Sequence, residues 1–173
     1  LGNDYIVVDL DRLSFPLTPG TIRHICHRNF GVGSDGILGL RPSPRADFGL
    51  RIFNPDGSEA EMCGNGIRCL AKYIVDRGYT KDSFAVQTLA GVVQVTARYD
   101  AEEEFFAAIG MPAPKFDRKD IPASGDGEYR EEILDYTVYA VNTGVPHAVV
   151  FVDEVGSVDI EEVAPAIRNH HTF

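Results

Sequence analysis

The sequence of 173 residues lacks several features that mark particular classes of protein. It has no excess of positive charge, because 16 Lys and Arg stand against 26 Asp and Glu, a formal net charge of −10. A nucleic-acid backbone or an anionic membrane surface is therefore disfavoured as a partner. No apolar run is long enough to span a bilayer, and no signal-peptide pattern opens the chain. With 44% hydrophobic residues, the composition predicts a soluble globular protein that binds neither nucleic acid nor membrane.

Cysteine is also scarce, since only Cys26, Cys63 and Cys69 occur. An odd number without disulfide-framework spacing fits a reducing compartment, so we expect a cytoplasmic protein. No C-x-x-C pattern accompanies His24, Cys26 and His27, and on a helix only the two histidines share a face. We interpret these histidines as ordinary helix-surface residues and predict no metal site.

Two nucleotide-binding patterns are absent or out of context. Gly31, Gly33 and Gly36 form G-x-G-x-x-G, but a predicted helix precedes them and a predicted strand follows, the reverse of the dinucleotide-binding order. The chain offers no G-K-[ST] for a phosphate-binding loop in its central stretch. Neither pattern predicts a nucleotide site here.

What the chain does contain is one stretch, residues 54–77, that predicts a turn, then a cysteine, then a helix. Asn-Pro-Asp-Gly at 54–57 is strong turn chemistry, and Gly78 stops the helical pattern. Cys63 should therefore lie at or just before a helix N-terminus. The apolar residues that recur at helical spacing are Ile67, Leu70, Ala71, Ile74 and Val75.

A thiol at a helix N-terminus has a physical meaning, because the free backbone N–H groups and the helix dipole stabilise an anion. Cys63 could thus act as a base near neutrality. Gly64 and Gly66 leave backbone amides uncovered, so a substrate carboxylate could bind at the same turn. Two alternatives stay open: a buried structural cysteine, and a Cys63–His147 protease pair, although the residues around Cys63 match no protease signature. Cys69 is interpreted as a packed side chain.

The remaining pattern predicts an α/β chain with a boundary in its second half. A stretch rich in Pro and Gly, residues 110–127, separates a first unit, 1–110, from a second, 111–173. We expect helices at 19–27 and 160–168 besides the central one, and strands at 5–9, 37–40, 48–53, 84–89, 92–97, 105–109, 136–141 and 148–152.

Residues 54–69 closely resemble the signature of the diaminopimelate epimerases. Three further matches follow in the family's order, at 1–5, 31–36 and 144–147. The resemblance implies an isomerase that needs no cofactor and interconverts LL- and meso-diaminopimelate, an amino-acid substrate used for lysine and cell-wall synthesis. It also implies two similar α/β halves, each a curved mixed sheet wrapped around a central helix, with the substrate held between them.

The resemblance also assigns roles to single residues. Inverting a stereocentre by proton transfer needs a base on one face and an acid on the other, so the family uses one thiol from each half. The expected site residues are Cys63 as the first acid/base, Asn3 and Asn54 as substrate contacts, Gly64 and Asn65 as N–H donors toward the substrate carboxylate, and His147 as the histidine that assists near the thiols.

The chain departs from the family pattern in three places. Val145 stands where an asparagine is common, two residues before the histidine, and Gly36 stands where a glutamine is common. The second thiol, with the Glu-Arg pair and glycine-rich motif around it, is absent. We therefore expect the first half and an incomplete second half of an epimerase, inactive in isolation.

Other readings remain beside this one. Proline racemase and hydroxyproline epimerase relatives place a histidine where Asn65 stands, which disfavours them. A truncated relative without catalytic activity, binding an amino acid or a partner chain, is the alternative from another class, and a homodimer is left open.

Overall fold

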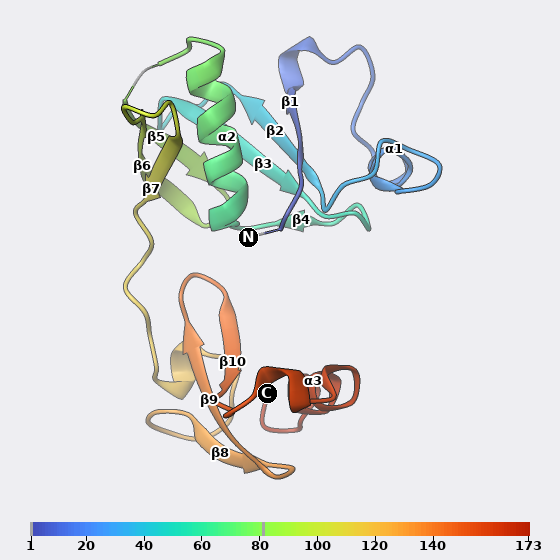
Figure 1. The fold of residues 1–173 in the computed structure, drawn as a ribbon, viewed down its shortest axis with the longest axis vertical. Helices are drawn as coiled ribbons and strands as arrows, with labels where there is room; N and C mark the ends of the chain where they lie inside the picture. The colour runs from blue at the N-terminus through green and yellow to red at the C-terminus, as the bar shows by residue number, and fades with distance from the viewer. Residues whose placement is uncertain (1, 81) are drawn as a thin grey trace. The chain divides into compact units, whose positions relative to one another are not determined.

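The computed structural model describes residues 2–80 and 82–173 (Figure 1). The chain divides into two compact units, Leu1–Met111 and Pro112–Phe173, which are described separately. Of the helices in the described residues, none has the length and apolar character that a membrane-spanning segment needs.

The first unit is built on a mixed sheet of seven strands. Along the sheet the order is β1-β2-β3-β5-β6-β7, and the short β4 pairs with β3. The pairs β1/β2 and β3/β5 are parallel, whereas the others are antiparallel. The strands are β1 (Ile6–Asp9), β2 (Ile37–Arg41), β3 (Phe48–Phe53), β4 (Glu59–Ala60), β5 (Ser83–Thr88), β6 (Gly91–Tyr99) and β7 (Phe105–Ile109).

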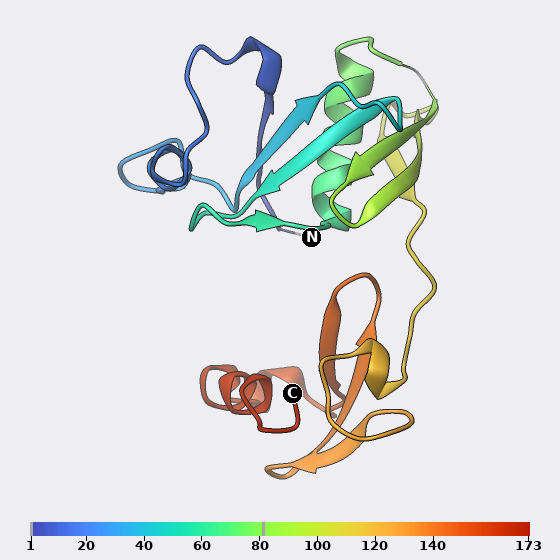
Figure 2. The same ribbon diagram turned by 180° about the vertical axis from the view of Figure 1, so that it is seen from behind.

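The central helix α2 (Gly64–Asp76) lies against this sheet. It contacts β1 and β2 at one end of the sheet and β6 and β7 at the other. A helix can reach both edges only if the sheet curves around it, as Figure 2 shows from behind. Four of its residues are completely buried: Ile67, Leu70, Ala71 and Ile74. The predicted fold, a curved mixed sheet wrapped around a central helix, is confirmed for this unit.

The helix α1 (Pro19–Cys26) begins as predicted, because the Thr18 side chain accepts a hydrogen bond from the Thr21 N–H and Pro19 is the first helical residue. Ile22 and Cys26 of α1 are buried against Ile37 of β2 and Phe53 of β3. The glycine-rich loop lies between α1 and β2, so the order is helix, loop, strand. Cys26 is thus a core residue.

His27 lies just past the C-terminal end of α1, where the prediction had extended the helix. Its Nδ1 accepts hydrogen bonds from the backbone N–H groups of Asn29, at 3.1 Å, and Phe30, at 3.2 Å. This ring therefore shapes the loop that follows α1.

The second unit contains a smaller antiparallel sheet in the order β10-β9-β8 and the helix α3 (Ile160–Arg168). Its strands are β8 (Arg130–Ile133), β9 (Tyr136–Asn142) and β10 (Pro146–Val150). Single turns of 3₁₀ helix occur in both units, at Leu10–Arg12, Arg118–Asp120 and Val155–Ser157.

One strand of this unit has bounds that differ from the prediction, and another was not predicted. The strand expected at 148–152 is β10, which begins at Pro146 and ends at Val150, so His147 is a strand residue and the loop from β9 is shorter than expected. β8 was not predicted, because three of its four residues are charged and show no apolar alternation.

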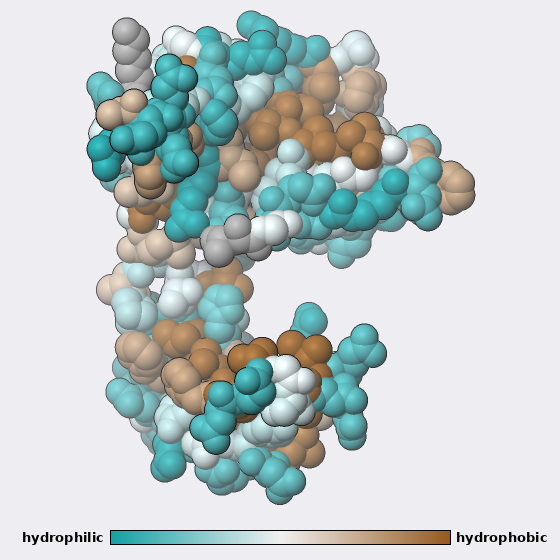
Figure 3. Space-filling model, viewed as in Figure 1, coloured by the Kyte–Doolittle hydropathy of each residue, from teal (hydrophilic) through white to brown (hydrophobic). Residues whose placement is uncertain are grey.

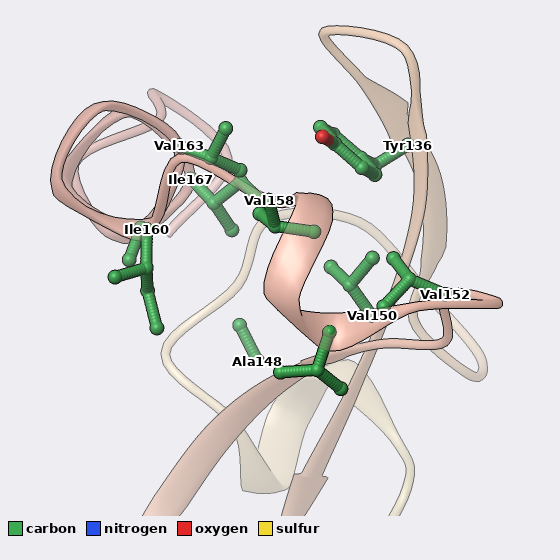
Figure 4. A pocket seen from close by; sticks show the side chains of 10 residues that line it. Tyr136, Ala148, Val150, Val152, Val158, Ile160, Val163 and Ile167 are labelled. Carbon is green, nitrogen blue, oxygen red and sulfur yellow. The ribbon is translucent and has the colours of Figure 1, made fainter.

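An apolar cavity of about 290 Å³ opens between the sheet and α3 of the second unit. Figure 4 shows the side chains that line it, mostly valine, isoleucine and alanine from β10, the loop after it and α3. Hydrophobic residues also reach the surface of this unit, as Figure 3 shows. The most exposed of them are Phe151, Val155 and Ile160.

Candidate active site at the start of the central helix

Cys63 is the N-cap of α2, in the position predicted from the turn and the helical spacing. Its backbone is extended, with φ −147° and ψ 108°, and its carbonyl accepts the first helical hydrogen bond from Ile67 N–H at 2.9 Å. Its Sγ accepts a hydrogen bond from the Gly66 N–H at 3.3 Å. The side chain is half-buried. A thiolate here would be held by the amides of the first helical turn.

The turn before the helix explains how the cysteine is placed. The Asn54 and Ser58 backbones are joined by a hydrogen bond of 2.9 Å from Asn54 N–H to Ser58 O, and the Asp56 carboxylate accepts from the Ser58 N–H at 2.8 Å. This turn joins β3 to β4, after which Met62 is buried in the core. The chain then enters α2 with Cys63 at its first capping position.

Gly66 allows the helix start to approach β2. A Cβ at this position would lie 3.0 Å from Leu38 Cδ2 and 3.5 Å from Cys63 Sγ. These contacts are tight, so a side chain would move Leu38 or the sulfur. Glycine at position 66 thus serves the packing against β2, whereas the hydrogen bond to Cys63 uses a backbone N–H that any residue except proline has.

Tyr5, immediately before β1, contacts the Cys63 thiol through its phenol, and the sequence did not predict this contact. Its Oη lies 3.2 Å from Cys63 Sγ, although the two residues are 58 positions apart. Burial, and next the hydrogen bond with Cys63, raise the pKa of the Tyr5 phenol well above its usual range. Tyr5 lies within a segment that matches the family, but no local sequence signal indicates a contact over that separation.

A chain of hydrogen bonds connects the helix start with the loop before β1. Arg68 donates to Asn65 Oδ1 at 3.2 Å, and Asn65 Nδ2 donates to Asn3 Oδ1 at 2.8 Å. Asn3 Nδ2 in turn donates to Asp35 Oδ2 at 3.3 Å. Two predicted site residues, Asn3 and Asn65, are therefore in direct contact, and each amide keeps further hydrogen-bonding capacity for a ligand.

An exposed ion cluster holds the outer end of this chain. The Arg28 guanidinium contacts Asp4 at 2.8 Å and Asp35 at 2.7 Å. The hydrogen bond between Arg28 and Asp4 is the main cause of both pKa shifts: it lowers the pKa of the Asp4 carboxyl and raises the pKa of Arg28. Because all three side chains are exposed, we expect a role in shaping the loops rather than a large contribution to stability.

Two further predicted site residues, Asn54 and His147, lie in a turn of the first unit and in a strand of the second. Asn54 is half-buried in the turn between β3 and β4, where its Nδ2 donates to Ser58 Oγ at 3.0 Å. His147 belongs to the second unit, is exposed, and pairs with Val141 in the β9/β10 register. Val145 is exposed in the turn before it.

Position 36 has a structural reason to be glycine. A Cβ there would overlap the carbonyl oxygen of Phe53, and the Gly36 carbonyl accepts hydrogen bonds from Ile6 N–H at 3.1 Å and Ser34 Oγ at 3.0 Å. Gly36, which stands where the family commonly has glutamine, therefore lies where two backbone segments approach too closely for a side chain.

The other two cysteines differ from Cys63 in their surroundings, and all three are free thiols. Cys26 is buried, and Ser34 Oγ lies 3.5 Å from its sulfur. Cys69 is half-buried along α2, and burial, followed by the nearby Cys63, raises the pKa of its thiol. Over residues 2–80 and 82–173, no three His, Cys, Asp or Glu side chains come together as a metal site would require.

A family model for diaminopimelate epimerase matches residues 1–114, which include all of these first-unit residues. The chain belongs to the diaminopimelate epimerase family. The diaminopimelate epimerase of Methanothrix thermoacetophila is 49% identical over 176 residues, and that of Archaeoglobus fulgidus is 42% identical over 178 residues. Each alignment covers 99% of this chain but only 62% of the relative, so the chain spans less than two thirds of the length of these family members.

Solved structures that resemble this family member confirm its fold. A Bacillus anthracis phenazine biosynthesis protein of the PhzF family aligns with a TM-score of 0.58 at 24% identity, over 86% of this chain and 50% of that protein. A probable proline racemase of Agrobacterium radiobacter aligns with a TM-score of 0.56 at 20% identity, over 82% and 44%. At these identities the likeness concerns the fold alone.

Proposed function

We propose that this protein forms part of a diaminopimelate epimerase that interconverts the LL and meso isomers by proton transfer between two thiols, without a cofactor. The match of the family model to residues 1–114 is the observation that carries the proposal. The two relatives named above, at 49% and 42% identity, carry the same name and support it. The placement of Cys63 at a helix N-terminus suits the chemistry.

In the proposed reaction, Cys63 is one of the two acid/base groups. As a thiolate it removes the α-hydrogen from one face of the substrate, and a second thiol delivers a proton to the opposite face; in the reverse direction the roles exchange. The α-hydrogen of an amino acid is weakly acidic, so the developing carbanion must be stabilised by hydrogen-bond donors aimed at the carboxylate. The N–H groups of Gly64 and Asn65 lie at the helix start, where no intrahelical acceptor exists for them.

The proposal gives the polar residues positioning roles. The hydrogen bonds that join Asn3 to Asn65 hold two amides in fixed orientations beside the thiol, as substrate recognition requires. Asn54 is proposed as a further substrate contact, and the role that the resemblance assigns to His147 is retained.

Neither remaining cysteine suits the part of the second thiol. Cys26 is enclosed by the core residues of α1, β2 and β3. Burial and the nearby Cys63 raise the pKa of Cys69, which disfavours the thiolate that the second group must form in the reverse direction. We therefore propose that the second thiol is supplied from outside these 173 residues, and that the 173-residue chain alone does not epimerise diaminopimelate.

Proton exchange tests the proposal. The protein expressed from its complete reading frame is incubated with LL-diaminopimelate in heavy water, and NMR follows the loss of the α-proton signal and the appearance of the meso isomer. We expect α-deuteration with diaminopimelate and none with L-proline. Exchange with proline alone would favour the racemase alternative, no exchange with either would favour a non-catalytic binder, and enzymatic turnover by the 173-residue chain would contradict an external second thiol.

A further inference from the structure

Two groups form hydrogen bonds with the sulfur of Cys63. One is the Gly66 N–H, at 3.3 Å from Sγ, which belongs to the same helix. The other is the Tyr5 hydroxyl, at 3.2 Å, which comes from the segment before β1. The half-buried thiol has lost part of its water, so protein donors must replace water around a thiolate.

The direction of the second hydrogen bond follows from the state of the phenol. Burial, and then the contact with Cys63, raise the pKa of Tyr5. The negative charges of a Cys63 thiolate and of the Asp35 carboxylate raise the pKa of Tyr5 further, and Arg28 lies 2.7 Å from the Asp35 carboxylate. Tyr5 thus keeps its proton over the range in which thiols ionise, so it donates to a Cys63 thiolate rather than accepting from it.

The ring of Tyr5 is held in place independently of this hydrogen bond. It packs against the core cluster between α2 and the sheet, and β1 contacts α2 directly. The strand that follows Tyr5 is fixed by its parallel pairing with β2, in which Ile6 lies opposite Ile37. The hydroxyl is therefore presented to Sγ by a residue that packs against the core and precedes a paired strand, as a positioning group requires.

We propose that Tyr5 is a positioning residue for the proton-transfer step, whose hydroxyl orients the Cys63 sulfur and stabilises its thiolate. This inference rests on the proposed function of Cys63. When the thiolate takes the α-hydrogen, the new bond is the Cys63 S–H bond and Tyr5 keeps its own proton. When Cys63 gives that proton back, the thiolate that remains again accepts from Tyr5 and Gly66. Tyr5 thus stabilises one state of Cys63 and is chemically unchanged over the cycle.

The substitution Tyr5→Phe tests this role, because it removes the hydroxyl and keeps the ring that packs in the core. The rate at which iodoacetamide alkylates Cys63 is measured by peptide mass spectrometry over about pH 6 to 10, a range that brackets thiol ionisation. Because a hydrogen bond to a charged group contributes roughly one to two pH units, we expect the pH midpoint of Cys63 alkylation to rise by about one unit, a tenfold change in ionisation.

Tyr79→Phe is the matched control, since Tyr79 lies in the same unit and its ring pairs with Phe48 and Tyr73. Its Cys63 profile should equal that of the unsubstituted protein. An unchanged or lowered midpoint in a folded Tyr5→Phe protein, judged by circular dichroism, would overturn the proposal. If Tyr5→Phe does not fold, 3-fluorotyrosine at position 5, a stronger donor, should lower the midpoint, and no change would overturn it.

The alkylation profile does not require epimerase activity, so the two proposals can fail separately. A shifted midpoint without any diaminopimelate exchange would leave the Tyr5 contact standing and contradict the proposed reaction. Diaminopimelate exchange together with an unshifted alkylation midpoint in Tyr5→Phe would support the proposed reaction and contradict the role of Tyr5.

Discussion

The two units each pack a helix against a sheet, but they bury it to very different extents. In the first unit, Ile67, Leu70, Ala71 and Ile74 of α2 have no exposed surface. In the second unit, α3 has one buried residue, Ile167, and its first residue, Ile160, is 68% exposed. A sheet whose two ends both contact the helix surrounds it, whereas the three strands of the second unit leave an apolar cavity open beside α3.

The two helices also use their N-termini differently. α3 is capped by the Asp159 carboxylate, and Glu161 and Glu162 occupy its first turn, so acidic side chains already offset the positive end of its dipole. The first turn of α2 has no acidic residue, and its cap is the Cys63 sulfur. The dipole of α2 therefore remains available for an anion, which is the physical basis for the acid/base role proposed for Cys63.

The largest difference in stability should appear between two variants that each replace an isoleucine by alanine, one in α2 and one in α3. Ile74→Ala removes a fully buried side chain and should cost about 2–5 kcal/mol of the free energy of unfolding of the first unit. Ile160→Ala removes an exposed side chain and should change the stability of the second unit by less than about 0.5 kcal/mol.

Hydrogen exchange followed by mass spectrometry measures this difference, since a chain with two units need not unfold in a single transition. Amides of β2, β3 and α2 report on the first unit, and those of β9 and α3 on the second. Equal losses of protection for the two variants would contradict the difference in burial described above.

A smaller effect is expected at alkaline pH, from Cys69. Burial, and then Cys63, raise the pKa of this thiol, so the unfolded chain loses the Cys69 proton at a lower pH than the folded chain does. The contribution of Cys69 to the free energy of unfolding is therefore complete below the usual thiol pKa. It is lost as the pH rises through the raised pKa of the folded state. In Cys69→Ala this decline should be absent.

Urea titrations followed by circular dichroism at neutral and alkaline pH measure that decline. The unfolding free energy of the unsubstituted chain should fall more steeply with pH than that of Cys69→Ala, even if the variant is less stable throughout. Parallel pH curves would show that the thiol environment does not differ between the folded and unfolded states.

Much of this structure follows from local sequence, and the exceptions have physical causes. The turn at 54–57, the cap at Cys63 and the apolar spacing of α2 are local signals, and they predicted the helix correctly. β4, with two residues, and β8, which is mostly charged, exist because neighbouring strands pair with them, so no pattern of their own indicates them. The Tyr5–Cys63 contact depends on how β1 lies beside α2, which pattern reasoning does not reach.

The most direct test of the account is solvent deuterium incorporation at the α-carbon of LL-diaminopimelate by two cysteine variants of the protein from its complete reading frame. Because a positioned acid/base group contributes about 10²–10⁴-fold, Cys63→Ala should lower the exchange rate by at least about 100-fold. Cys69 lies six positions further along the chain, in α2, and the Cys69→Ala variant should retain most of the exchange rate. Near-normal exchange by a folded Cys63→Ala protein would contradict the central claim that the sulfur at the start of α2 moves the proton.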